Sequence, residues 1–322
     1  MTTVAAVKMN AWVTVADYHF PGGWQPETPG ARTAGGGRGA QICRQLESGE
    51  ILFFNGVPFD LPADDLEFLL SQTQSESRFH KNISYRPLKD ALHGASAENA
   101  QRLRQIMQRY SQRVTAFVED FLAPYAGMLA LDFASFRPLE ERGRDLPLHK
   151  RNDLLHVDAF PTRPTRGGRI LRVFTNINPT QPRIWTTGAP FHQLAPRYAR
   201  DAGLERFAAQ SRSPIFKIRR SATRAFRRLG FPLADRSAYD RFMLHFHDWL
   251  KENSDFQNSG ARMRSEFPSG STWLVYTDGV PHAALTGQFA LEHTYIVPPA
   301  ALVEAKLSPI RVLEELAGVR LA

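Results

Sequence analysis

A histidine and an aspartate stand two positions apart in the short apolar segment LLHVDAF, residues 154–160. Because successive side chains of a strand point to opposite faces, His156 and Asp158 would share one face while Val157 points the other way. Imidazole and carboxylate are both metal ligands, so the pair is either part of a solvated strand face or two ligands aimed at one point. A third ligand would complete a facial triad, the arrangement that suits non-haem Fe(II).

The third ligand has to come from the remaining histidines of a chain that has ten. His282 opens a predicted strand beside a chain reversal, which could bring it next to His156. His293 lies deeper in the same predicted strand and has the opposite parity, so it would face away. His245 and His247 fall in a helical pattern, where residues i and i+2 diverge, and are interpreted as surface or satisfied histidines. A strand-end histidine bonded to backbone would explain His282 alone, but beside the His-x-Asp pair the metal interpretation is favoured.

The composition limits the possible chemistry and partners. The chain has 322 residues, a net charge of +8 and one cysteine, Cys43. A single cysteine excludes an intrachain disulfide framework and a thiolate-built zinc site, so any metal must use histidine and carboxylate ligands. The sequence shows neither a long apolar run nor a leader pattern, which predicts a cytoplasmic protein. The positive charge predicts an anionic partner: nucleic acid, a phospholipid surface or an acidic substrate.

Strands on both sides of a helical insertion dominate the predicted architecture. Residues 1–40 are rich in proline and glycine and predict an irregular arm, followed by a single domain over residues 41–322. Apolar residues at helical spacing predict a scaffold helix over about residues 96–125, and a basic helical insertion covers about residues 195–258. Strands are predicted at residues 131–138, 169–179, 183–188, 271–279 and 282–298. Without a βαβ alternation, this order favours an antiparallel β-barrel or sandwich with added helices.

The ordered set of motifs resembles a known superfamily. HVD, then RVFTNINPTQPRIWTTG, then WLVYTDGVPHAALTGQFALEHTYIVP resemble the double-stranded β-helix, or jelly-roll, core of Fe(II)/2-oxoglutarate-dependent oxygenases. Together with HKNISYRP at residues 80–87, they resemble bacterial hydroxylases of 3-deoxy-D-manno-octulosonic acid (Kdo). The resemblance implies a dioxygenase with Fe(II), 2-oxoglutarate and dioxygen, and metal ligands His156, Asp158 and His282. No separate catalytic acid or base is then required.

The same resemblance requires a cation for the distal carboxylate of 2-oxoglutarate. Many members carry it shortly after the distal histidine, where this chain has Glu292. Arg172 is the first candidate because it follows His-x-Asp on the next strand, and buried guanidinium suits a carboxylate. Asn176, on the same strand face, is a supporting contact, and Arg183 is the reserve candidate. Alternatively, Arg172 faces solvent or pairs with Glu292.

The basic residues fit the anionic substrate that the resemblance implies. Residues 211–231 hold seven cations and no acid, interleaved with apolar residues, a pattern typical of contact with anionic lipid. Candidate substrate-binding residues are Arg142, Arg144, Lys150, Arg151, Arg219 and Arg220. The resemblance implies hydroxylation at C3 of Kdo in Kdo-lipid A, giving Ko, at the inner face of the cytoplasmic membrane, with no nucleic-acid partner. The alternatives are an oxygenase acting on a protein, nucleobase or small molecule, and a non-enzymatic barrel that binds anionic lipid or nucleic acid.

Overall fold

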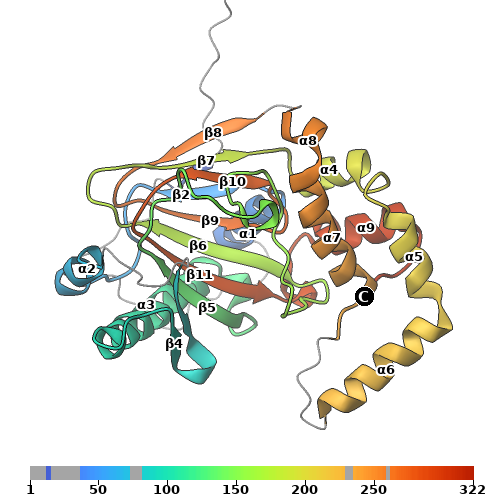
Figure 1. Cartoon of the computed structure of the whole chain (residues 1–322), viewed down its shortest axis with the longest axis horizontal. Coiled ribbons are helices and arrows are strands. Elements are labelled where there is room, and N and C mark those ends of the chain that lie inside the picture. Colours follow the sequence, from blue (N-terminus) through green and yellow to red (C-terminus); the bar gives the residue numbers. More distant parts are fainter. Residues whose placement is uncertain (1–11, 16–36, 73–81, 229–234, 259–261) are drawn as a thin grey trace, which may run out of the picture.

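The computed structural model describes residues 12–15, 37–72, 82–228, 235–258 and 262–322, and two β-sheets form its centre (Figure 1). The large sheet has eight strands in the spatial order β1-β2-β9-β6-β11-β5-β3-β4, and only the β1–β2 pair is parallel. Its strands are β1 (Trp12–Thr14), β2 (Ile51–Phe54), β3 (Ile83–Arg86), β4 (Ala91–His93), β5 (Ala130–Arg137), β6 (Arg169–Asn176), β9 (Thr272–Tyr276) and β11 (Ala290–Val297).

The small sheet packs against one face of the large sheet. It has the order β10-β7-β8, formed by β7 (Arg183–Thr187), β8 (Met263–Phe267) and β10 (His282–Thr286). Aromatic residues from both sheets, among them Phe174 of β6 and Trp185 of β7, form one buried cluster between them. Two facing sheets, antiparallel except for the β1–β2 pair, confirm the predicted mainly β architecture. The predicted strand over residues 154–160 is reduced to an isolated bridge between His156 and His282.

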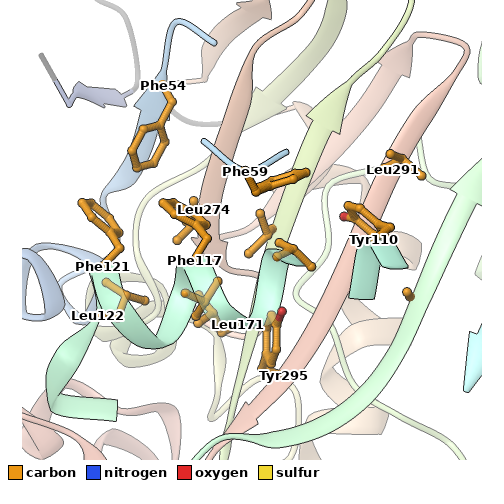
Figure 2. Packing of buried hydrophobic residues seen from close by; sticks show 14 of the residues in the cluster. Phe54, Phe59, Tyr110, Phe117, Phe121, Leu122, Leu171, Leu274, Leu291 and Tyr295 are labelled. Carbon is orange, nitrogen blue, oxygen red and sulfur yellow. The ribbon is translucent and has the colours of Figure 1, made fainter. Parts of the chain in front are cut away.

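The opposite face of the large sheet carries the main hydrophobic core (Figure 2). Helices α1 (Arg38–Glu47), α2 (Ala63–Leu70) and α3 (Ala100–Phe121) cover this side, and Phe117 of α3 packs edge-on against Phe54 of β2. The apolar stripe predicted for α3 is buried. The helix is shorter than the predicted residues 96–125: it begins at Ala100 and ends at Phe121, and a 3₁₀ turn containing Pro124 follows it.

The predicted helical insertion lies between β7 and β8. Its helices are α4 (Phe191–Tyr198), α5 (Leu204–Arg212), α6 (Pro214–Arg228), α7 (Ala238–Glu252) and α8 (Ser254–Asn258). They share a second core cluster with the C-terminal helix α9 (Pro309–Ala317) and with Leu155 and Val157 of the His-x-Asp segment. Helix α6 extends away from the body of the protein (Figure 1). Among the described residues, no helix combines the length and the apolarity needed to cross a membrane.

Two predicted segments differ from the structure. The predicted strand over residues 282–298 is two strands: β10 belongs to the small sheet and β11 to the large one. Between them, Gly287 has φ +133° and its missing side chain leaves room for Arg183, so the chain turns there and changes sheets. The predicted N-terminal arm contributes β1 to the large sheet, and α1 begins at Arg38. The remainder of residues 1–36 lies outside the described residues.

Candidate functional site

The structure brings His156, Asp158 and His282 together at the seam between the two sheets. His156 and His282 exchange two backbone hydrogen bonds, with N···O distances of 3.2 and 2.9 Å. The backbone N–H of Asp158 donates to the carbonyl of Thr277, just beyond β9, at 2.8 Å. The Asp158 carboxylate oxygens then lie 3.8 Å from His156 Nε2 and 4.0 Å from His282 Nε2. The sequence separation is large, yet the three side chains converge.

Both histidines present a nitrogen lone pair to this point. Nδ1 of His156 lies 2.7 Å from the carbonyl oxygen of Leu154, and Nδ1 of His282 lies 2.9 Å from that of Val280. A carbonyl only accepts, so each Nδ1 carries the proton and each Nε2 keeps its lone pair. Burial lowers the pKa of both histidines below the usual value, which favours the neutral, metal-binding form.

The Asp158 carboxylate is the anionic member of the group. Burial alone would raise the pKa of Asp158, but the positive charge of Arg172, the largest opposing effect, helps to hold the pKa below its usual range. Its Oδ2 accepts no hydrogen bond from the described residues, although Arg172 Nη2 lies 3.1 Å away as an ion-pair partner. A buried, ionised oxygen without a hydrogen bond beside two imidazole lone pairs fits a divalent metal ion.

His247 of α7 also lies next to this group, where the helical pattern predicts a surface or satisfied histidine. Its Nδ1 donates to the carbonyl of Val157 at 2.8 Å, and its ring centre is 4.8 Å from that of His156. The nearest potential ligand atoms of His156, Asp158 and His247 lie within 4.8 Å of one another. We favour His282 as the third ligand because it lines the adjacent cavity with His156 and Asp158, whereas His247 does not.

The cavity beside the triad is lined by ten residues: Arg137, Asn152, His156, Asp158, Arg172, Phe174, Arg183, Trp185, His282 and Ala284. Three of its buried N–H groups have no acceptor among the described residues, namely Arg172 Nε, Arg183 Nε and Trp185 Nε1. Buried donors are normally paired, so three unpaired donors around one cavity fit a ligand with acceptor oxygens. Two of the three are guanidinium groups, which favours a carboxylate.

A network of alternating charges supports the cavity wall. Arg172 reaches Asp158 with one terminal nitrogen and Glu292 Oε1 with the other, at 2.8 Å from Glu292. Arg137 binds the second oxygen of Glu292 through two nitrogens. Burial would raise the pKa of Glu292, but Arg137 and Arg172 lower it, so Glu292 is ionised. The Arg172–Glu292 pairing considered in the sequence is therefore present, and Arg172 still lines the cavity.

Glu141 extends this network to the far side of the cavity. Its Oε1 lies 3.3 Å from Arg137 Nη1 and 3.2 Å from Arg183 Nη2, and Asn152 donates to its other oxygen. Arg183 also donates to the carbonyl of Gly287 at 3.1 Å. Two carboxylates thus orient three arginines toward one space. The sequence offered no signal for Arg137, Glu141 or Trp185, because their roles depend on which strands lie side by side.

The other predicted site residues lie outside this cavity. The Asn176 amide donates to the carbonyls of Gln181 and Phe267, so it supports a loop and does not line the cavity. The loop cations Arg142 and Lys150 are exposed, Arg144 is half-buried, and Arg151 pairs with Asp153 at 2.6 Å. Arg220 pairs with Asp235 at 3.1 Å, and the side chain of Arg219 lies outside the described residues.

The fold and the site define a class: facing sheets of jelly-roll type that hold a His-x-Asp…His group beside a cation-lined cavity are typical of non-haem metal oxygenases. Residues 32–320 match the family model described as 3-deoxy-D-manno-oct-2-ulosonic acid (Kdo) hydroxylase, and the chain belongs to that family. The family predicted from the motifs is confirmed.

Solved structures give the same result. A crystal structure of the Kdo hydroxylase KdoO, a non-haem Fe(II) α-ketoglutarate (2-oxoglutarate)-dependent dioxygenase, in complex with α-ketoglutarate and Fe(III), has a TM-score of 0.74 and 34% identity, covering 88% of this chain and 91% of its own. The cobalt(II) complex of KdoO has the same identity and TM-score, and the apo structure is 35% identical. No curated protein sequence matches the chain. The predicted jelly-roll fold, the Fe(II)/2-oxoglutarate-dependent dioxygenase class and its cofactors are confirmed.

Proposed function

We propose that this protein hydroxylates C3 of a Kdo sugar in Kdo-lipid A, giving Ko during synthesis of the lipopolysaccharide inner core. The observation that carries the proposal is the joint geometry of the site. His156, Asp158 and His282 converge beside a cavity whose wall contains three buried donors without acceptors among the described residues. A non-enzymatic binding barrel would not require a metal-ligand group beside a cavity with unpaired donors.

Each residue of the site has a defined task in this proposal. Nε2 of His156, Nε2 of His282 and the Asp158 carboxylate hold Fe(II), which together with 2-oxoglutarate and dioxygen supplies the oxidising chemistry. The unpaired N–H groups of Arg172, Arg183 and Trp185 orient 2-oxoglutarate by donating hydrogen bonds to its carboxylate oxygens. The buried aromatic cluster between the sheets keeps water away from this end of the cavity.

We propose that the loop between β5 and β6 binds the anionic sugar. This loop contributes Asn152, His156 and Asp158 to the cavity, and it also carries Arg142, Arg144, Lys150 and Arg151. The two exposed members, Arg142 and Lys150, lie where the Kdo carboxylate or lipid phosphates could reach them. The substrate would be met at the inner leaflet of the cytoplasmic membrane, with the protein bound peripherally.

Two measurements on one pair of variants test the proposal. Under anaerobic conditions, Fe(II) and 2-oxoglutarate should produce a weak visible charge-transfer band, which His156→Ala should abolish and His93→Ala, an exposed histidine, should leave unchanged. With oxygen admitted, Kdo-lipid A should gain one oxygen atom only when iron and 2-oxoglutarate are both present. If the band survives His156→Ala, the proposed ligand set is wrong. If succinate forms faster with a protein, nucleobase or free sugar than with Kdo-lipid A, the proposed substrate is wrong.

A further inference from the structure

Helix α6 carries aliphatic side chains on its exposed face. Ile215 and Ile218 are 70% and 69% exposed. Phe216 instead packs against the second core cluster, and Arg220 pairs with the fully buried Asp235. A helix on the surface of a globular protein normally turns its apolar stripe inward and its charges outward. In α6, a cation and one aromatic ring face the body while two isoleucines face solvent.

The composition around this exposed face is strongly cationic. Residues 211–231 contain seven lysines and arginines and no acidic residue. At about 3.6 residues per turn, positions 215, 218 and 226 fall on one side of α6, and Phe226 there is 49% exposed. Apolar side chains flanked by cations are the composition of a helix that lies in the plane of a membrane interface.

A basic pocket lies at the base of the same helix. Its lining combines the end of α5, the first turns of α6 and the C-terminal tail: Ser211, Arg212, Phe216, Arg220, Ser221, Val319, Arg320, Leu321 and Ala322. The guanidinium groups of Arg212 and Arg320 in this lining are donors that suit phosphate oxygens. The pocket therefore shares α6 with the exposed isoleucines Ile215 and Ile218.

We propose that α6 and this pocket form the docking surface for a bilayer that contains anionic phospholipid. Ile215 and Ile218 enter the interface between headgroups and acyl chains, and the pocket receives a lipid phosphate. The inference rests on the proposed function, because Kdo-lipid A is presented in a membrane. A nucleic acid would neutralise the cations but leave the isoleucines in water. A second copy of the chain would bring two sets of seven positive charges together.

Co-sedimentation with vesicles tests the docking surface without any reaction. The wild-type protein should bind vesicles of phosphatidylcholine with phosphatidylglycerol and bind pure phosphatidylcholine weakly. Ile215→Ser with Ile218→Ser should lower the partition coefficient about a hundredfold, since burial of each of the two aliphatic side chains contributes about tenfold. Arg212→Gln with Arg320→Gln should reduce binding to the anionic vesicles only. Leu88→Ser is the matched control, because Leu88 is 79% exposed and lies outside α6.

The outcomes separate this inference from the proposed function. If the isoleucine variant binds anionic vesicles like the wild type, or if it loses self-association instead, the docking surface is wrong. Turnover on a water-soluble Kdo saccharide should be the same in the isoleucine variant and the wild type, whereas turnover on vesicle-bound Kdo-lipid A should fall. Loss of both activities would contradict a docking role. A wild type that binds vesicles but hydroxylates neither substrate would refute the proposed function and leave the docking surface standing.

Discussion

At the scale of single residues, Glu292 explains why this chain departs from the common superfamily pattern. A position about ten residues after the distal histidine often carries the cation that binds 2-oxoglutarate, and in this chain the fully buried carboxylate of Glu292 stands there, on β11. It holds Arg172 and Arg137, which come from the neighbouring strands β6 and β5. The cations of the cavity thus come from other strands, and Glu292 sets their direction.

Replacing this carboxylate tests its role. Glu292→Gln keeps the shape but removes the carboxylate that Arg172 and Arg137 share, leaving Asp158 and Glu141 as their remaining partners, so we expect the free energy of unfolding to fall by up to about 3–5 kcal/mol. The KM for 2-oxoglutarate should rise more than kcat falls, because Arg172 loses its orientation. Urea denaturation and steady-state kinetics measure both effects. Asp60→Asn is the control: its pair with Arg113 is exposed and is worth at most about 1 kcal/mol. An unchanged KM for 2-oxoglutarate would show that Glu292 stabilises the fold but does not orient Arg172 for ligand binding.

The sequence predicted a site residue only where its side chain is a metal ligand or a cation and its position in a strand indicates which face it points to. His156 and Asp158 share a face as predicted, although the segment is a single bridge and no regular strand. Arg172 and Arg183 were the first and the reserve candidates for binding the 2-oxoglutarate carboxylate, and both line the cavity. His247 was set aside, because a helical pattern cannot show that α7 packs onto the carbonyl of Val157.

At the scale of elements, the contact between α3 and β11 determines where the side chain of His293 lies. The sequence assigns it a face away from the metal, and the structure buries it completely in the main core, where Ser111 of α3 is 2.8 Å from its Nε2. The reason differs from the predicted one, because His293 lies in β11 and His282 in β10. The alternation of apolar and polar residues continues on both sides of Gly287. It therefore could not show that the segment is divided into β10 and β11.

Burial of His293 predicts a pH dependence of stability. Burial lowers the pKa of His293 from 6.5 to about 3, so between these values the unfolded chain binds a proton that the folded chain does not. Stability therefore falls as the pH drops below 6.5, by up to about 1.4 kcal/mol per pH unit for this group. Urea denaturation across this range should show a shallower pH dependence for His293→Gln than for the wild type. His93→Gln, at an exposed site, should leave the slope unchanged; equal slopes for all three proteins would contradict the assignment.

At the scale of the whole molecule, the site joins the two sheets. Arg172 and Phe174 come from β6 of the large sheet, Trp185 from β7 and His282 from β10 of the small sheet. Sequence patterns predicted most of these strands separately, but their facing arrangement depends on tertiary packing. A ligand that contacts residues of both sheets should therefore stabilise the protein as a unit.

Binding of the metal and 2-oxoglutarate should increase the free energy of unfolding. Co(II) with 2-oxoglutarate, at one hundred times the dissociation constant, should raise the free energy of unfolding by about 2.7 kcal/mol. Asp158→Ala should abolish this gain, because it removes the anionic ligand, and Asp60→Asn should retain it. Denaturation with and without the ligands measures the difference. A full gain in Asp158→Ala would place the metal elsewhere.

The paired backbone hydrogen bonds between His156 and His282 have a consequence for how such an enzyme can diversify. Each histidine also anchors its ring to the carbonyl two residues before it, so ligand spacing and ring tautomer both follow from the main chain. Side chains around the cavity can then be exchanged during evolution while the metal geometry is inherited unchanged. We expect new sugar specificities in this family to arise by substitutions in the β5–β6 loop, with no compensating change at the two histidines.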